Sequence, residues 1–255
     1  MSDTMERMRG KVCLVTGGGT GIGLATALQI AREGARGVVT AARREVEGVA
    51  AAAACRELGA DSIFVPTDIT SEDDVARIVG QILDRFGRLD AVFNNAGYQE
   101  RRAPVETQAD EVYSRVFDTN VRGVFYCLRH QIPAMLGSGG GTIVINTSVS
   151  GIRNPNPGFA IYNASKAAVI AMMRTAALEN AARGIRINAV APGRVVTDMM
   201  LSAGVGDMSA IADTLPLKRM GKPEEVAEAA IWLLSDQSSY AVGHVLAVDG
   251  GFLAG

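Results

Sequence analysis

The chain alternates short, nearly continuous apolar runs with longer segments of helical periodicity, and this alternation constrains its fold more than any other feature. Such alternation is typical of a parallel sheet whose strands are joined by crossover helices. Strands covered on both faces read as continuous apolar runs. We therefore predict an α/β fold with strands at 12–15, 38–41, 62–65, 89–93, 142–146, 185–190 and 245–248.

Several helix signals lie between these runs. Apolar residues recur at three- and four-residue steps from Val75 to Phe86, and Ser71 can cap that helix. Pro223 followed by two glutamates marks another helix start. No linker divides the chain, so we predict one domain, 1–255. The segment 199–217 is rich in Met, Ala, Gly and Ser, and is expected to form a substrate flap.

Composition excludes several classes of function. The formal net charge is -2, which gives no reason to expect nucleic acid or an anionic membrane as a partner. Apolar stretches are too short to span a bilayer, and the polar N-terminus does not resemble a signal peptide. Three isolated cysteines and two scattered histidines suggest neither disulfides nor a metal site. We expect a cytoplasmic protein without a metal.

A glycine-rich turn follows the first predicted strand directly and leads into a helix near Ile22. Strand, glycines and helix together place a pyrophosphate against backbone N–H groups and the positive helix end. Glycine lets the backbone approach the ligand closely because it has no Cβ. The alternative is an ordinary flexible turn. The residues concerned are Gly17, Gly19, Thr20, Gly21, Ile22 and Gly23.

Tyr162 and Lys166 stand four residues apart, which puts both side chains on one face of a helix. A phenol has a pKa of about 10, and a neighbouring ammonium lowers it. The pair is therefore a plausible acid/base device, although a buried tyrosine beside a solvated lysine has the same spacing. The glycine turn favours the first interpretation. Ser148 has no histidine at hydrolase spacing, which argues against a serine nucleophile.

Seven short motifs in one order resemble the short-chain dehydrogenase/reductase family over nearly the whole chain. They are Thr16-Gly17-x-x-x-Gly21-Ile22-Gly23, Asn94-Asn95-Ala96-Gly97, Asn120, Ser148, Tyr162-x-x-x-Lys166, Pro192-Gly193 with Thr197, and Asp249-Gly250-Gly251. The resemblance implies a Rossmann-type, doubly wound parallel sheet of about seven strands and a nicotinamide cofactor.

The resemblance also implies roles for single residues. Tyr162 would be the acid/base, Ser148 would bind the substrate oxygen, and Asn120 would hold a water. Lys166 would bind the nicotinamide ribose and lower the pKa of Tyr162. Further cofactor contacts would come from Asp68, Ile69, Asn94, Ala96, Gly97, Pro192, Gly193, Val195 and Thr197. For Asp68 and Thr197, the alternative is a helix cap.

The end of the second predicted strand bears on the choice of cofactor. Ala42 stands where relatives that prefer NAD carry aspartate, and Arg43 follows it. An arginine here can accommodate the 2′-phosphate of NADP. We therefore favour NADP(H), the alternative being an arginine that only stacks on adenine.

The substrate is less constrained. Pocket candidates are Tyr98, Ser150, Asn154, Asn156, Phe159, Val195 and the flap, and no cluster of arginines suggests an acidic substrate. We expect hydride transfer between the cofactor and a small neutral secondary alcohol or ketone. A catalytically silent nucleotide-binding sensor or scaffold, and a dehydratase or epimerase, are the alternatives. The resemblance further implies a homotetramer.

Overall fold

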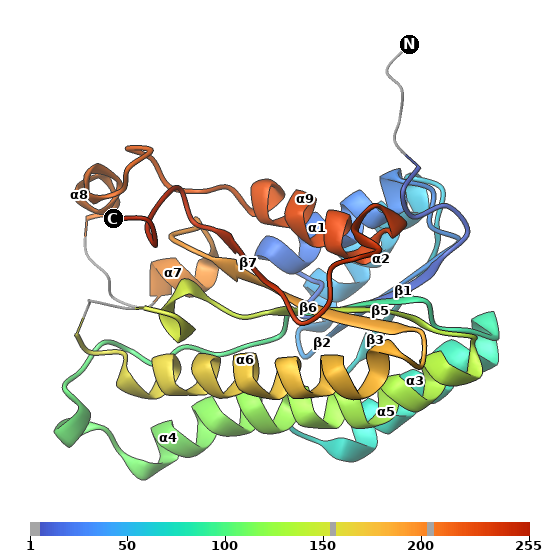
Figure 1. Cartoon of the computed structure of the whole chain (residues 1–255), viewed down its shortest axis with the longest axis horizontal. Helices are drawn as coiled ribbons and strands as arrows, with labels where there is room; N and C mark the ends of the chain where they lie inside the picture. Colours follow the sequence, from blue (N-terminus) through green and yellow to red (C-terminus); the bar gives the residue numbers. More distant parts are fainter. Residues whose placement is uncertain (1–5, 154–156, 203–206) are drawn as a thin grey trace.

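A single seven-stranded parallel sheet forms the centre of the protein. The computed structural model describes residues 6–153, 157–202 and 207–255 (Figure 1). The strand order is β3-β2-β1-β4-β5-β6-β7, and every neighbouring pair is parallel. The strands are β1 (Val12–Thr16), β2 (Gly37–Ala42), β3 (Asp61–Pro66), β4 (Ala91–Asn94), β5 (Gly141–Asn146), β6 (Ile185–Pro192) and β7 (Val245–Val248).

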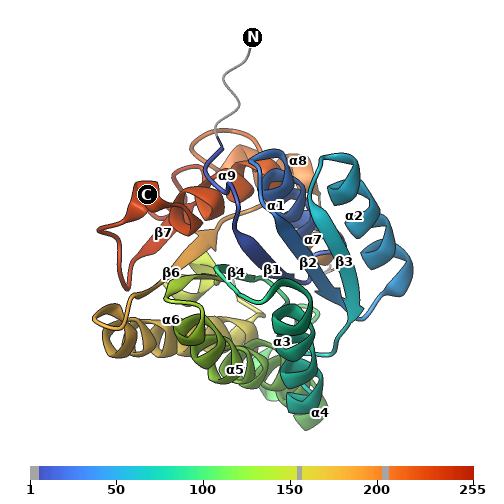
Figure 2. The same cartoon turned by 90° about the vertical axis from the view of Figure 1, so that its right-hand side faces the viewer.

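Helices cover both faces of the sheet, so the predicted doubly wound architecture is confirmed (Figure 2). On one side lie α1 (Gly21–Arg32), α2 (Glu45–Glu57) and α9 (Pro223–Leu234). The other side carries α3 (Glu72–Phe86), α4 (Asp110–Phe117), α5 (Gly123–Gly137) and α6 (Ala160–Ala181). Each layer buries its own apolar core, with Ile30 and Ile231 on the first side and Ile82 and Met173 on the second. Short helices α7 (Asp198–Ser202) and α8 (Met208–Thr214) stand apart from both layers.

The strand order reverses between β1 and β4, and polar side chains tie the loops together there. The Thr16 hydroxyl accepts hydrogen bonds from the backbone N–H groups of Asn95 and Ala96, at 3.0 and 3.1 Å. Asn95 in turn donates to the carbonyls of Thr16 and Gly17. In open α/β sheets, ligands bind where the strand order reverses, beyond the carboxyl ends of the strands. These bonds therefore fix the backbone at the expected ligand site.

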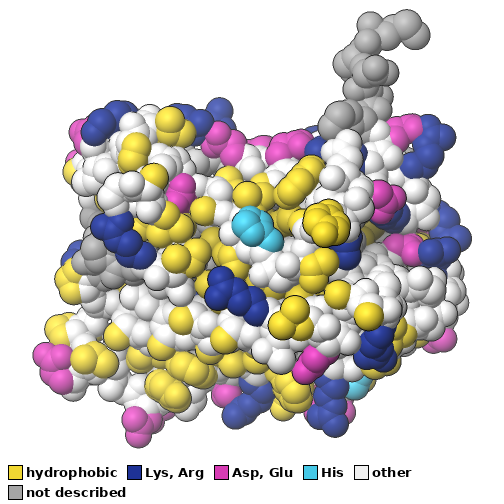
Figure 3. Space-filling model, viewed as in Figure 1, with side chains coloured by type: hydrophobic (Ala, Val, Ile, Leu, Met, Phe, Trp, Pro, Cys, Tyr) yellow, Lys and Arg dark blue, Asp and Glu magenta, His cyan; other side chains and the backbone are white. Residues whose placement is uncertain are grey.

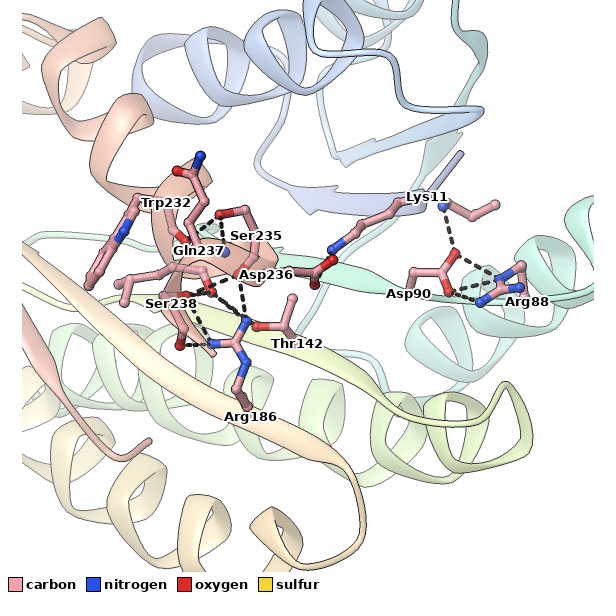
Figure 4. Close-up of polar contacts among 12 residues, drawn as sticks. Lys11, Arg88, Asp90, Thr142, Arg186, Trp232, Ser235, Asp236, Gln237 and Ser238 are labelled. Atoms are coloured by element: carbon pink, nitrogen blue, oxygen red, sulfur yellow. Dashed lines mark hydrogen bonds and ion pairs between the residues drawn. The ribbon is translucent and has the colours of Figure 1, made fainter. Parts of the chain in front are cut away.

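A second polar network fixes the opposite end of the sheet (Figure 4). Arg186 in β6 donates to the carbonyls of Ser235 and Ser238, which follow α9, at 2.8 and 2.9 Å. Asp90 accepts from the backbone N–H of Val12 at 2.8 Å and pairs with Arg88. Hydrogen bonds to charged groups are worth more than neutral ones, typically about 1.5–3 kcal/mol. The network thus holds the strands at the end remote from the site.

Most predicted element positions agree with the structure. Ser71 accepts from Asp74 N–H and caps α3, and α9 begins at Pro223, as predicted. The fourth strand begins at Ala91 rather than at Leu89, whose backbone N–H donates to the Ser138 hydroxyl rather than to a neighbouring strand. The predicted flap, 199–217, contains most of α7 and all of α8. Within the described ranges, no helix is both long and apolar enough to cross a membrane.

Candidate active site

The glycine turn forms a backbone cradle at the N-terminus of α1. Gly17 and Gly21 have φ of +65° and +54°, a region that favours glycine. A Cβ on Gly17 would lie 2.8 Å from the Asn95 side chain. All of α1 is described, and its first turn holds no acidic residue. The positive end of the helix is therefore open to an anion, which fits the pyrophosphate of a dinucleotide.

This cradle opens into a cavity of about 540 Å³ that runs across the carboxyl ends of the strands. Most of the residues predicted from the sequence line it: Gly17, Gly19, Thr20, Gly21, Ile22, Arg43, Asp68, Ile69, Ala96, Gly97, Ser148, Tyr162, Lys166, Pro192, Gly193, Val195 and Thr197. Of the pocket candidates, Tyr98 and Ser150 also line it. Asn154 and Asn156 lie outside the described residues.

Gly23, Asn94 and Asn120 are predicted site residues that do not line the cavity. Gly23 lies inside α1, where a Cβ would collide with the Gly17 carbonyl oxygen, so it allows the helix to approach the turn. Asn94 is buried and exchanges two side-chain hydrogen bonds with Gln131 of α5, at 2.8 and 2.9 Å. Its neighbour Asn95 lines the cavity instead.

Tyr162 lies in the first turn of α6, buried against Phe159. Its side chain and that of Ser148 line the same cavity, where both can face a shared substrate oxygen. Burial raises the pKa of Tyr162 to about 12, because the phenolate is desolvated, and the nearby Ser148 side chain opposes this shift. The phenol is thus protonated at neutral pH in the cofactor-free protein.

Lys166 lies one turn further along α6 and is 6% exposed. Its ammonium donates to the Asn146 carbonyl at 2.9 Å and lies 5.6 Å from the centroid of the Tyr162 ring. Burial lowers the pKa of Lys166 to about 8. The expected lowering of the Tyr162 pKa by Lys166 is not found in this structure, where burial of the phenol has the largest effect on that pKa.

Asn120 lies in a π-helical turn between α4 and α5, η2 (Asp118–Arg122). Its amide donates to the Tyr98 carbonyl and to the Ser165 hydroxyl, at 2.8 and 2.9 Å, and its oxygen accepts from Tyr98 N–H. Both amide hydrogens are therefore used within the protein. The side chain joins the loop after β4 to α6, and the water-holding role remains a prediction.

Glu100 is a buried carboxyl group that the sequence analysis did not identify. It is fully buried, and its Oε1 atom accepts from Tyr162 N–H at 3.0 Å. Among the residues that the structure describes, its Oε2 atom has no hydrogen-bond partner. The N-cap residue of α6, Phe159, supplies no side-chain cap, so Glu100 caps this helix from another segment. Its charge raises the pKa of Tyr162.

Asp68 and Thr197 line the cavity and also make local hydrogen bonds, although Ser71 rather than Asp68 caps α3; their cofactor contacts remain predictions. Asp68 accepts from the backbone and the hydroxyl of Thr70 and so shapes the turn before α3, while lining the cavity. Thr197 accepts from Met200 N–H at 3.3 Å at the start of α7. It also faces the cradle, since a Cβ on Gly21 would lie 3.4 Å from it.

Two arginines flank the cavity at the end of β2. Arg43 is exposed and lines it. Arg44 also lines it, donates to the Thr20 hydroxyl at 2.8 Å and pairs with Glu47. This end of the cavity therefore carries two cations and the single nearby carboxylate of Glu47, which Arg44 neutralises in part.

A second cavity, of about 510 Å³, adjoins the first and corrects one expectation. Arg102, Arg153 and Arg194 all line it, so arginines do gather near the substrate site. Arg194 and Phe252 line both cavities. The three arginines are far apart in the sequence, which is why they were not recognised as a cluster.

Comparison with known proteins agrees with this geometry. A family model described as enoyl-(acyl carrier protein) reductase matches residues 17–253. An A-factor type gamma-butyrolactone 1'-reductase (1S-forming) from Streptomyces virginiae is 41% identical over 255 residues, covering 99% of each chain. The structure of levodione reductase superposes with a TM-score of 0.92 at 34% identity, over 97% of this chain and 99% of that one. NAD+-bound xylitol dehydrogenase gives 0.90 at 36% identity, over 96% and 99%.

The chain belongs to the short-chain dehydrogenase/reductase family. It is an enzyme of nicotinamide-dependent oxidoreduction.

Proposed function

We propose that this protein interconverts a secondary alcohol and the corresponding ketone, with NADP(H) favoured over NAD(H). The observation that carries the proposal is that Tyr162, Ser148 and Lys166 line the same cavity that the glycine cradle opens into. A nicotinamide cofactor carries the hydride when bound, so the protein needs only to bind, orient and move a proton.

The chemistry of the residues follows from the charge that develops on the substrate oxygen. Hydride addition to a carbonyl leaves negative charge on that oxygen, and preplaced donors stabilise it. Ser148 and Tyr162 are two such donors, and Tyr162 gives its proton to complete the reduction. In the oxidation direction Tyr162 must first lose its proton, which its raised pKa opposes.

Lys166 and the cradle support the binding role. The N-terminus of α1 and the glycines would hold the pyrophosphate, and Lys166 would bind the nicotinamide ribose. A negatively charged cofactor at this buried ammonium would also favour its charged form, and a charged Lys166 would lower the pKa of Tyr162. We therefore expect the pKa of Tyr162 in the holoenzyme to lie below the value of about 12 in the cofactor-free protein.

The preference for NADP(H) rests on the end of β2. Ala42 offers no carboxylate to a ribose 2′-hydroxyl, while Arg43 and Arg44 line the cavity beside it. Guanidinium groups bind phosphate through paired, charge-assisted hydrogen bonds. Arg43 is exposed and available for such contacts.

We also propose a homotetramer located in the cytoplasm. Exposed apolar side chains support the assembly: Tyr113, Phe125, Leu178 and Trp232 on α4, α5, α6 and α9, and Tyr240 and Val242 between α9 and β7. Figure 3 shows hydrophobic side chains spread over the face that carries α6 and β7. Light scattering coupled to size exclusion would test the assembly, and a monomeric mass would overturn it.

Absorbance at the reduced-nicotinamide band tests the activity directly. The purified protein is offered a panel of ketones and secondary alcohols with each cofactor. Turnover of at least one pair, faster with NADP(H), is the expected result. Cofactor binding without any turnover would favour a nucleotide-binding sensor instead.

A further inference from the structure

Arg194 lies at the junction of the two cavities, lining both. It follows the Pro192-Gly193 turn and is half-buried. Its guanidinium stacks over the Phe252 ring, 5.9 Å from the ring centroid. Within the described ranges, its side chain has no ion pair or hydrogen bond. Burial lowers the pKa of Arg194, because the cation has lost part of its hydration.

Two further arginines face the same cavity. Arg102 donates to the Pro157 carbonyl at 3.1 Å, and Arg153 donates to the carbonyl of Gly255. The Pro157 carbonyl is a neutral acceptor, so Arg102 keeps its full charge. The Arg102 charge is close enough to disfavour the charged form of Arg194. Like charges held together without an anion between them are unfavourable, and an anion bound there would relieve the repulsion.

The remaining described walls are mostly apolar, and Asp207 is the side-chain carboxylate among them. Phe159, Ile211, Pro216 and Phe252 line the cavity. The Asp207 carboxylate accepts from the backbone and the hydroxyl of Ser209, at 2.9 and 2.8 Å. Within the described part of the chain, Asp207 does not pair with any of the three arginines. The cavity therefore combines more arginines than acidic side chains with room for a hydrocarbon.

The position of Arg194 connects this charge to the reaction. Arg194 lines the cavity that contains Tyr162 and Ser148, and its charge acts on the Tyr162 phenol. A molecule whose hydroxyl or carbonyl group meets Tyr162 can thus extend into the second cavity past Arg194 and Phe252.

We propose that the second cavity binds an anionic group of the substrate, a carboxylate or a phosphate, which Arg194 contacts directly and Arg102 and Arg153 attract. The proposal rests on the proposed function, because it names the substrate of the same site. It replaces the neutral substrate expected from the sequence with a hydroxy or oxo compound that carries an anion on an apolar chain.

Equilibrium binding to the enzyme saturated with oxidised cofactor tests the site independently of turnover. The probes are hexanoate, hexyl phosphate and the neutral hexanamide, measured by calorimetry. Wild type is expected to bind at least one anion about 10-fold or more tightly than hexanamide, as a charge-assisted hydrogen bond predicts. The tighter anion identifies the group.

Variants assign the effect to the cluster. Arg194→Gln should abolish the preference for the anion, and Arg102→Gln, at an exposed position, should reduce it in part. Arg101→Gln removes a neighbouring exposed charge outside the cavity and should leave the preference unchanged. Circular dichroism verifies the fold of each variant.

Kinetics with matched pairs then connects the site to catalysis. Each oxocarboxylate of a panel is compared with its methyl ester, and wild type should favour the acid in kcat/KM. No preference for either anion over hexanamide, or one that persists in Arg194→Gln, would overturn the proposal. The proposal would also be overturned if Arg194→Gln lost affinity for the cofactor but kept the wild-type preference for the anion. If no ketone is reduced, the proposed function fails, whereas the binding result still decides the anion site.

Discussion

The Glu100 carboxyl group accepts a hydrogen bond from the backbone N–H of Tyr162 at 3.0 Å, while its second oxygen is buried without a partner in the described part of the chain. The same group therefore holds the first turn of α6 and places negative charge beside the proposed acid/base. A buried unpaired oxygen is unfavourable for stability. Its presence next to Tyr162 fits a role in setting the proton affinity of the phenol.

Glu100→Gln should shift the pH profile of alcohol oxidation to lower pH. The carboxylate raises the pKa of Tyr162, so its removal lowers that pKa, and the phenolate then forms at lower pH. The glutamine oxygen can still accept from Tyr162 N–H, which preserves the helix cap. The measurement is kcat/KM for oxidation as a function of pH. Glu106→Gln, at an exposed position, is the control, and a Glu100→Gln profile identical to wild type would exclude the charge effect.

Tyr162→Phe should reduce kcat by about 10²–10⁴-fold, the usual contribution of a positioned general acid. Affinity for the cofactor should change little, because the glycine cradle is untouched. Steady-state kinetics and a fluorescence titration of the reduced cofactor provide the two readouts. A variant that retains more than about a tenth of wild-type kcat would contradict the acid/base role.

Lys166→Met should weaken cofactor binding and yet stabilise the cofactor-free protein near pH 7. The folded-state pKa of Lys166 is about 8, below its ordinary value of 10.5. The folded state thus binds fewer protons between these values, and wild-type stability rises with pH across that window. Methionine carries no charge to desolvate, so the variant should gain about 1–3 kcal/mol below pH 8, after the loss of the Asn146 bond is included.

Chemical denaturation of wild type and Lys166→Met at pH 7 and pH 10 measures this effect. The advantage of the variant should be largest at pH 7 and should shrink toward pH 10. Arg174→Met, at an exposed position of the same helix, is a control without a buried charge. An advantage independent of pH would show that Lys166 is not held with a lowered pKa.

The sheet was predictable because strands covered on both faces appear in the sequence as continuous apolar runs. Most of the site was predictable too, since the motifs lie at the carboxyl ends of those runs. Asn94 and Asn95 show where this reasoning fails. Side chains of successive extended residues point to opposite faces of a sheet. At the end of β4, Asn94 is hydrogen-bonded to Gln131, whereas the next residue, Asn95, lines the cavity.

Features that depend on burial or on distant contacts could not be predicted. Glu100 lies in the polar run Gln99-Glu100-Arg101-Arg102, which resembles an exposed turn. Only tertiary packing places it beneath Tyr162. Likewise, the spacing of Tyr162 and Lys166 predicts their proximity, but not the desolvation that moves the pKa of Tyr162 upward.

Arg43→Ala should weaken the binding of NADP(H) by about 1.5–3 kcal/mol, the range for a hydrogen bond to a charged group. The binding of NAD(H) should remain nearly unchanged. The reason is that Arg43 lines the cavity at the end of β2, where only the 2′-substituent distinguishes the cofactors. Ala42→Asp should act in the opposite sense, because a carboxylate repels the 2′-phosphate and accepts from a free 2′-hydroxyl.

The ratio of kcat/KM for the two cofactors, in wild type and both variants, measures the preference. Arg36→Ala, which removes an arginine at the other end of β2, controls for the general loss of positive charge.

Arg44 is a second candidate for the phosphate contact, since it lines the same region while paired with Glu47. If Arg44 carries the phosphate contact, Arg44→Ala will change the ratio and Arg43→Ala will not. Wild type that already prefers NAD(H), or an Arg43→Ala variant that loses both cofactors equally, would mean that Arg43 stacks on adenine or faces solvent.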